Sequence, residues 1–376
     1  FAKFMSDRKV DIKGNRELEA LTMIDLDFEN VRIAWLRIVD HGSWEKFPDM
    51  LFSLWFYCDV RSRSHDVIQL FDYAIQALQS AIPSPKIDLA RGRVLAWTGW
   101  FYNDLGFSDK CINMCQEAIR ILEPFDATED LIVAYHGISV SLATQGFTQD
   151  LQPISTISHK LAQILGDIYW QANTLVPYAI AKSIDRDEDA IVILKQIQPL
   201  FEGLGNKMGL SAIFGTEAIL LYFSGNYQNA KDLMHRAEDL ITSLNSAYHS
   251  ADNLLWLGII SIRLGDYKQA GHYLRQSLQH LWNAGYIHFI GDSLLHLCTV
   301  LLHENQIQRA VEIVAKIPEF PAYHSNLFNI DGFYDTLLIE LRSRLQPELF
   351  DIAWERGKKR EIGAIVREIL HEQSTV

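Results

Sequence analysis

A few clustered cysteines, histidines and carboxylates are the residues of this 376-residue chain whose types could do chemistry. Cys111 and Cys115 are four residues apart and therefore share one helix face, but a metal site needs further ligands, and the neighbouring sequence offers none. Buried cysteine behaves as a small hydrophobic side chain, so we interpret this pair as core. Only four cysteines occur and they are scattered, which excludes a disulfide framework and favours a reducing, cytoplasmic location.

Two further groups could hold a metal ion. His296, Cys298 and His303 fall in one predicted helix, with the histidines seven residues apart and so on similar faces. This spacing allows a metal site, but Cys298 falls at a close-packing position of the repeat and no H-E-x-x-H motif is present, so we favour surface or core histidines. The acidic run 185–189 has the composition of a calcium loop but lacks its glycine and terminal glutamate, so we interpret it as a solvated turn. We predict no metal and no cofactor.

Catalytic and membrane motifs are missing from the sequence. There is no G-x-x-x-x-G-K-[ST] loop and no G-x-S-x-G motif, and the run 356–359 lacks the first glycine and the hydroxyl residue of a phosphate loop. The net charge of −13 argues against nucleic acid as a direct partner, because phosphate contacts need a basic face. No signal peptide and no run of membrane-span length occur. We expect no enzyme and no membrane partner, and Phe1 in place of Met suggests a piece of a longer protein.

The elements that would position any site recur with a fixed period. A residue able to end a helix occurs at Gly106, Gly146, Asp185, Gly225, Gly265 and Asn305. Glycine accepts the left-handed conformation of a helix end, and Asn and Asp tolerate it better than most residues. The period is roughly 40 residues, in the range that indicates stacked helix pairs. We predict an all-α, right-handed superhelical solenoid of antiparallel helix pairs, with a tight turn inside each pair and a looser turn between pairs.

Small or apolar residues recur at fixed distances from this signal, where the two helices of a pair must approach closely. Seven residues before it stand Gly99, Ser139, Tyr178, Ala218, Gly258 and Cys298. Five residues after it stand Cys111, Leu151, Ala190, Ala230, Ala270 and Ala310. Pro153 and Pro177 fall inside predicted helices of the two weakest copies, and proline bends or breaks a helix. We therefore predict a bend across about residues 150–180.

These copies resemble the tetratricopeptide repeat. The copy over 95–124 matches it through Leu95, Gly99, Tyr102, Gly106, Cys111, Ala118 and Pro124. The copies over 214–237 and 254–277 match as well, although the period here exceeds the 34 residues of that family. The resemblance implies that the first helix of each pair lines an inner, concave face.

Both ends of the chain extend the resemblance. An acidic-Asn-x-Arg-x-Ala segment at 29–34 precedes the repeats, and an Ala-Trp-x-x-Gly segment at 353–357 closes them. Such ends are similar to the C-terminal sensor regions of bacterial signal-transduction ATPases of the STAND type, including LuxR-type and antibiotic-regulatory-type transcription regulators. The resemblance implies a sensor that binds a protein, peptide or small-molecule inducer and controls an upstream NTPase module of the same polypeptide. A free-standing interaction scaffold stays open, and an enzyme is the remotest alternative.

The expected organisation is an N-terminal helical segment over 1–60, repeats over 61–345 and capping helices over 346–376. Ligand-binding candidates are side chains expected on the concave face, where Trp and Tyr supply contact area and Arg supplies a planar fork for carboxylate or phosphate. They are Arg93, Trp100, Asn103, His136, Lys182, Tyr222, Arg263 and His303. The helical spacing of Trp97, Trp100 and Trp256 fits core between repeats as well as ligand contact, so both interpretations remain.

Overall fold

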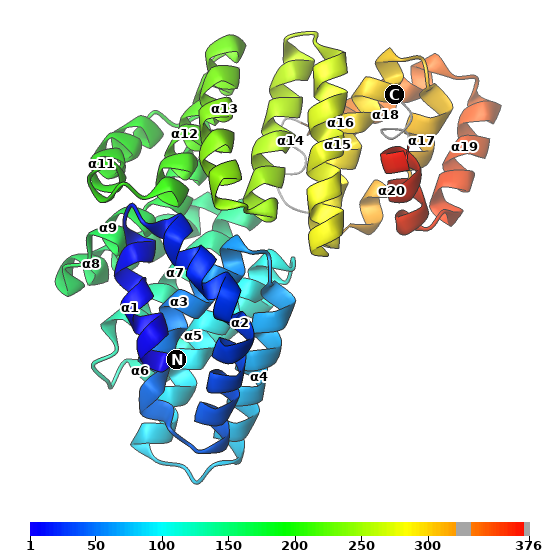
Figure 1. The fold of residues 1–376 in the computed structure, drawn as a ribbon. Coiled ribbons are helices and arrows are strands. Elements are labelled where there is room, and N and C mark those ends of the chain that lie inside the picture. Colours follow the sequence, from blue (N-terminus) through cyan, green and yellow to red (C-terminus); the bar gives the residue numbers. More distant parts are fainter. Residues whose placement is uncertain (321–331, 372–376) are drawn as a thin grey trace. The chain divides into compact units, whose positions relative to one another are not determined.

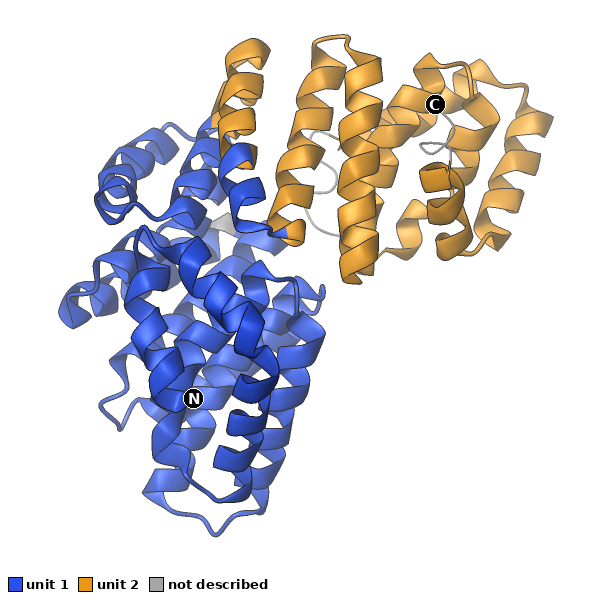
Figure 2. Ribbon diagram, viewed as in Figure 1, with its two compact units in different colours: residues 1–217, 239–246 blue, residues 218–238, 247–376 orange. Residues whose placement is uncertain are grey.

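The computed structural model describes residues 1–320 and 332–371, and over these residues the chain is a solenoid of paired helices without a strand (Figure 1). The predicted all-α repeat solenoid is therefore confirmed. The chain forms two compact units, which we treat separately (Figure 2). Unit 1 comprises residues 1–217 and 239–246, and unit 2 comprises residues 218–238 and 247–376.

The helices are antiparallel neighbours joined by short turns. Those of unit 1 are α1 Ala2–Lys13, α2 Glu17–Asp40, α3 Phe47–Val60, α4 Ser64–Ser80, α5 Pro85–Asp104, α6 Ser108–Leu122, α7 Thr128–Gln145, α8 Thr148–Leu165, α9 Ile168–Asn173, α10 Val176–Ile184 and α11 Asp189–Leu204, with a 3-10 turn at Trp44–Lys46. Two helices have residues in both units, α12 Lys207–Phe223 and α13 Tyr227–Leu244. Those of unit 2 are α14 Ala247–Arg263, α15 Tyr267–Ala284, α16 Ile290–His303, α17 Ile307–Val314, α18 Phe333–Arg344, α19 Pro347–Lys359 and α20 Ile362–His371, with 3-10 turns at Ile287–Phe289 and Ile317–Glu319.

The turns inside the helix pairs follow the predicted period, with one correction. Left-handed backbone occurs at Gly106, Gly146, Arg186, Gly225, Gly265 and Asn305. Asp185 was expected in this series, but its φ is −71°, and Arg186 takes φ 59° instead. The carboxylate of Asp187 binds Lys182 at 2.5 Å and accepts from the backbone N–H of Asp189 at 2.9 Å, so the start of α11 fixes the turn one residue later than predicted.

A second series of left-handed residues ends the second helices of four pairs. These residues are Gly166, Gly205, Asn245 and Gly285. They recur with the same period as the first series, so both turns of the repeat are tight. The sequence predicted a looser turn here, so this part of the prediction is corrected.

Small residues let the helices of a pair approach as predicted. A Cβ added at Gly99 would lie 2.6 Å from Cys115 Sγ, and one added at Gly258 would lie 2.6 Å from Leu274 Cγ. The shifted turn also corrects the alignment of the third pair. Ala179 is fully buried and takes the close-packing position, whereas Tyr178 is half-buried.

The first helix of the third pair is broken. α9 ends at Asn173, and α10 starts two residues after Thr174 with Pro177 in its first turn. Proline lacks the N–H that would continue the hydrogen-bond ladder, which explains the interruption. Pro153 lies inside α8 without ending it. The bend across residues 150–180 and the three domain boundaries stay predictions.

Candidate functional site

Inside unit 1 the inner sides of several first helices are filled by aromatic rings. Trp55 of α3 lies 5.6 Å from Trp97 and 5.2 Å from Trp100 of α5, measured between ring centroids. Phe52 of α3 lies 6.0 Å from Trp170 of α9. The rings of Trp55, Trp97 and Trp170 are at most 2% exposed. These helices therefore bury most of their own inner surface.

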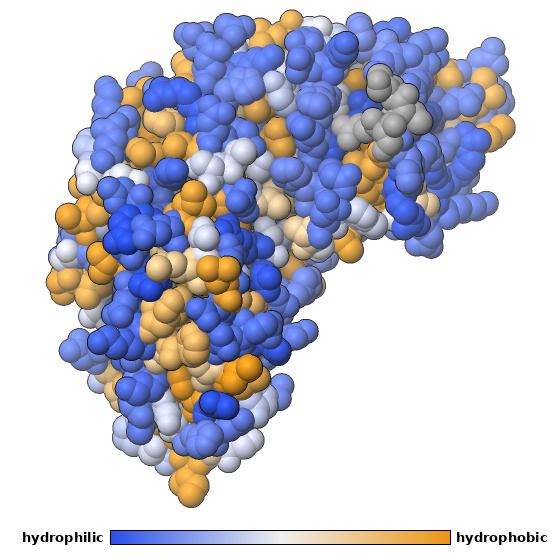
Figure 3. Space-filling model, in the orientation of Figure 1, coloured by the Kyte–Doolittle hydropathy of each residue, from blue (hydrophilic) through white to orange (hydrophobic). Residues whose placement is uncertain are grey.

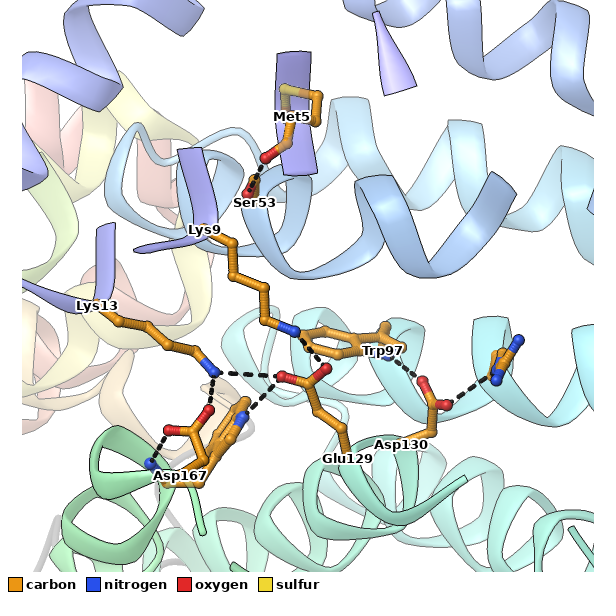
Figure 4. A network of polar contacts seen from close by, with 10 residues as sticks. Met5, Lys9, Lys13, Ser53, Trp97, Glu129, Asp130 and Asp167 are labelled. Carbon is orange, nitrogen blue, oxygen red and sulfur yellow. Dashed lines mark hydrogen bonds and ion pairs between the residues drawn. The ribbon is translucent and has the colours of Figure 1, made fainter. Parts of the chain in front are cut away.

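The N-terminal helix α1 closes this surface with two lysines (Figure 4). Lys9 Nζ lies 2.5 Å from Glu129, and Lys13 Nζ lies 3.3 Å from Glu129 and 2.5 Å from Asp167. Lys13 Nζ also lies 4.6 Å from the ring centroid of Phe52. Burial lowers the pKa of Lys13, and the two carboxylates oppose that shift by favouring the ammonium. Helix α1 of the same chain therefore covers the inner surface of unit 1.

Two predicted ligand residues of unit 1 are engaged within the fold. Arg93 Nε donates to Asp130 at 3.0 Å across the α5–α7 contact. Trp100 Nε1 donates to Asp59 at 3.0 Å, and its ring stacks on His136 with centroids 5.3 Å apart. Both side chains are half-buried, so their main role in this structure is to hold neighbouring helices together.

Two other candidates of unit 1 are core residues. Asn103 is 4% exposed and accepts a hydrogen bond from Ser108 Oγ at 2.9 Å, while His136 is 2% exposed. Burial lowers the pKa of His136 to about 3, so its imidazole is neutral. Its Nδ1 has no hydrogen-bond partner among the described residues. Because neither side chain reaches the surface, we leave both out of the binding surface proposed below.

In unit 2, helix α14 has a row of side chains on the face away from its partner, with exposed members at both ends. Its partner α15 packs on one face, where Gly258 meets Leu274 and Ser277 Oγ donates to the carbonyl of Ala251 at 2.7 Å. The opposite face, given the helical periodicity, carries Asp252, Trp256, Ile259 and Arg263. Successive members of this row are three or four residues apart, about one helical turn.

Helix α16 presents a matching row one repeat later. Its partner α17 packs on the face that holds Cys298, whose Sγ lies 3.6 Å from the carbonyl of Ala310. The opposite face carries Asp292, His296 and Thr299. We call these two rows, Asp252, Trp256, Ile259 and Arg263 with Asp292, His296 and Thr299, the inner face of unit 2. His303 has the next position, but its ring stacks on Tyr267 at 3.8 Å, beside the turn between α14 and α15.

One end of the inner face of unit 2 is acidic. Asp252 is exposed and Asp292 is half-buried, at equivalent positions of consecutive first helices. Burial and the charge of Asp252 raise the pKa of Asp292 to about 7. Burial also raises the pKa of Asp252, although its side chain is open to solvent and His249 opposes the shift. Two neighbouring carboxylates, of which one raises the proton affinity of the other, favour a cationic partner.

The other end is basic and aromatic. Arg263 Nε donates to Tyr222 Oη at 3.1 Å, and its guanidinium lies 5.7 Å from the centroid of that ring. The ring of Tyr222 meets the edge of Trp256 with centroids 5.7 Å apart. The structure thus brings the candidates Tyr222 and Arg263 together. Asp252 and Asp292 were missed, although their separation by one repeat could have revealed them.

Lys182, the remaining candidate, lies near the end of α10 in unit 1. Its Nζ lies 5.5 Å from the ring centroid of Tyr178, and its ion pair with Asp187 belongs to the following turn. It does not gather with the other candidates of unit 1. No group of three or more possible metal ligands occurs within residues 1–320 and 332–371.

On the face drawn in Figure 3, hydrophobic residues form patches among hydrophilic ones. The most exposed large apolar side chains, such as Leu26 and Ile82, are far apart in sequence and lie in unit 1. Of the helices described, none combines the length and the apolar character needed to cross a bilayer.

Comparison with known proteins gives structural likeness only. No family model matches the sequence, and no curated protein matches it. The chain is similar to a Rap protein solved in complex with Competence and Sporulation Factor, with 13% identity, a TM-score of 0.58, and coverage of 86% of this chain and 90% of that one. This protein has a tetratricopeptide-like helical-repeat fold.

Two further structures are similar at lower TM-scores. One is PH0952 from Pyrococcus horikoshii, a STAND protein with a tetratricopeptide-repeat sensor, at 12% identity and a TM-score of 0.48, covering 87% of this chain and 49% of that one. The other is the apo form of RapI, at 13% identity and a TM-score of 0.47, covering 86% of this chain and 96% of that one.

Proposed function

We propose that this chain is a binding module that recognises a protein or peptide partner through the inner face of unit 2. The observation that carries the proposal is the contrast between the two units. The inner surface of unit 1 is filled by aromatic rings and by Lys9 and Lys13 of α1. The inner face of unit 2 keeps Asp252 and Arg263 exposed on either side of Trp256.

The chemistry of this face suits a polypeptide. Arginine beside a tyrosine ring, as in Arg263 and Tyr222, offers a planar donor group together with a large rigid surface. Such residues carry much of the binding energy at protein interfaces. A face two helices wide also suits a long ligand better than a small substrate, and peptides commonly bind between or along helices.

The proposed role of this binding is sensory. We propose that the partner shifts the equilibrium between two states of an upstream NTPase module of the same polypeptide, with transcription regulation as the output. The segments at 29–34 and 353–357 support the sensory role, because they resemble the ends of STAND-type sensor regions. The second motif is also a packing element, because Ala353 is 1% exposed and Gly357 lies against the backbone of Glu312.

The binding function is tested by selection from a display library of random dodecapeptides on the immobilised chain. We expect enriched peptides that bind in fluorescence anisotropy and lose at least tenfold in affinity for the Arg263→Ala variant. Binding that is equal for the wild type and Arg263→Ala contradicts the assignment to this face. The sensory role is tested separately on the full polypeptide, whose NTPase rate must change when a selected peptide is added. A full polypeptide without a Walker-type loop would exclude the sensory role and favour a free-standing interaction scaffold.

A further inference from the structure

Opposite charges stand at the two ends of the row on α14. Asp252 and Arg263 are eleven residues apart on one face, and a helix rises about 1.5 Å per residue. Their Cα atoms are therefore separated by roughly 16 Å along the helix axis. Trp256 and Ile259 lie between them and give the face an apolar middle.

The acidic end has the properties of a cation site. Asp292 adds a second carboxylate from the neighbouring helix α16, and burial raises its pKa. No ion pair to Asp252 or Asp292 is formed within the described residues, although Asp292 is half-buried and has lost part of its hydration. A lysine or arginine side chain placed there would restore that lost solvation and relieve the repulsion between the two aspartates.

The middle of the face and its basic end complete the pattern. Trp256 and Ile259 of α14 and the half-buried Thr299 of α16 lie between the charged ends. Arg263 is exposed at the other end, where its guanidinium suits a carboxylate.

The distance between the acidic and basic ends sets the distance between the two charged side chains of a bound peptide. An extended peptide rises about 3.3 Å per residue, so roughly 16 Å corresponds to about five residues. We infer that the inner face of unit 2 selects an extended peptide segment that carries a basic side chain and an acidic side chain about five residues apart. The basic side chain binds Asp252 and Asp292, and the acidic one binds Arg263. This inference rests on the proposed binding function and names the chemistry of its partner.

The test uses the full chain and the same dodecapeptide library. Enriched peptides should contain a Lys or Arg separated by four to six positions from an Asp or Glu, well above the frequency in the unselected library. The Asp252→Asn/Asp292→Asn variant should bind these peptides at least tenfold more weakly. The loss should shrink to less than twofold for a peptide whose basic residue is replaced by norleucine, because the pair has then already been broken.

A matched control removes two carboxylates from a second helix. Asp232 and Asp239 of α13 are exposed, and Asp232→Asn/Asp239→Asn should leave peptide affinity unchanged. The Asn substitutions preserve side-chain shape, and unchanged helicity by circular dichroism confirms that the variants are folded.

The outcomes separate the two proposals. If no peptide is enriched, the binding function itself fails. If peptides are enriched and sensitive to Arg263→Ala but show no charge pair, or bind Asp252→Asn/Asp292→Asn as tightly as the wild type, only the present inference is overturned. A tenfold loss that persists with the norleucine peptide also overturns it, because the carboxylates then act without the basic side chain.

Discussion

At the scale of single residues, burial decides which candidates remain available to a ligand. His136 and Asn103 were chosen because the first helix of each pair lines the inner face. A first helix, however, has one face toward its neighbours and one toward the interior of the unit, and in unit 1 both are covered. The sequence pattern predicts the helix, but it does not predict which other parts of the chain pack on its faces. Asp252 and Asp292 were not candidates, but the structure places both on the inner face of unit 2, where they form its acidic end.

The buried imidazole of His136 should make unit 1 sensitive to acid. Its pKa is about 3 in the fold, against about 6.5 when unfolded, so between these values the unfolded state binds a proton that the folded state does not. The stability from this residue is complete above pH 6.5 and is lost by about 1.4 kcal/mol per pH unit as the pH falls. We expect His136→Phe, which keeps the stacking on Trp100, to reduce the difference in unfolding free energy between pH 8 and pH 5. Urea unfolding at both pH values measures it, and a difference equal to that of the wild type would show that His136 does not stay neutral.

At the scale of elements, the sequence predicted most of the helix pairs because their turns and contacts are set by local residues. Glycine in the left-handed region and small residues at the contact recur with the period, so each pair is encoded within its own repeat. The one error in alignment, Asp185 in place of Arg186, arose because the start of α11 fixes that turn rather than the residue in it. The break between α9 and α10 follows from Pro177.

The contact within a pair predicts opposite effects for two glycines. Gly258→Ala places a methyl group 2.6 Å from Leu274 Cγ, a buried atom near the root of its side chain, and should cost about 1–3 kcal/mol. Gly203, in α11, has nothing within 4 Å of an added Cβ, so Gly203→Ala should gain about 0.5–1 kcal/mol from helix propensity alone. Thermal unfolding of the two variants measures the contrast. A stabilised Gly258→Ala would mean that α14 and α15 are not packed this closely.

At the scale of the molecule, unit 1 departs from the nearest-neighbour contacts of a simple solenoid. Glu17 accepts hydrogen bonds from Asn206 Nδ2 at 2.8 Å and from the backbone N–H of Lys207 at 2.5 Å. Arg61 donates to the carbonyl of Leu244. The partners in these bonds lie far apart in the sequence, and no local pattern in the sequence predicts them. For the same reason the sequence did not reveal that α1 occupies the inner surface of unit 1.

The lysines of α1 should therefore support the whole of unit 1 rather than their own helix. Lys13→Ala leaves Glu129 and Asp167 without the ammonium that both contact, in a setting where each carboxylate is only about a quarter exposed. Breaking such a partly buried network costs about 2–3 kcal/mol. Hydrogen exchange measured by mass spectrometry should show faster exchange in α1, α3, α7 and α9 together, because Lys13 and its neighbours join these helices.

Lys3→Ala is the matched control for this prediction, because Lys3 lies on the same helix and is exposed. It should leave exchange unchanged in α7 and α9. If Lys13→Ala instead accelerates exchange only in residues 1–13, then α1 is a terminal cap, and the inner surface of unit 1 is stable without it. Contacts between neighbouring helix pairs would then be enough to stabilise unit 1. Removal of α1 would in that case expose the Phe52–Trp170 cluster as a second surface that a partner could bind.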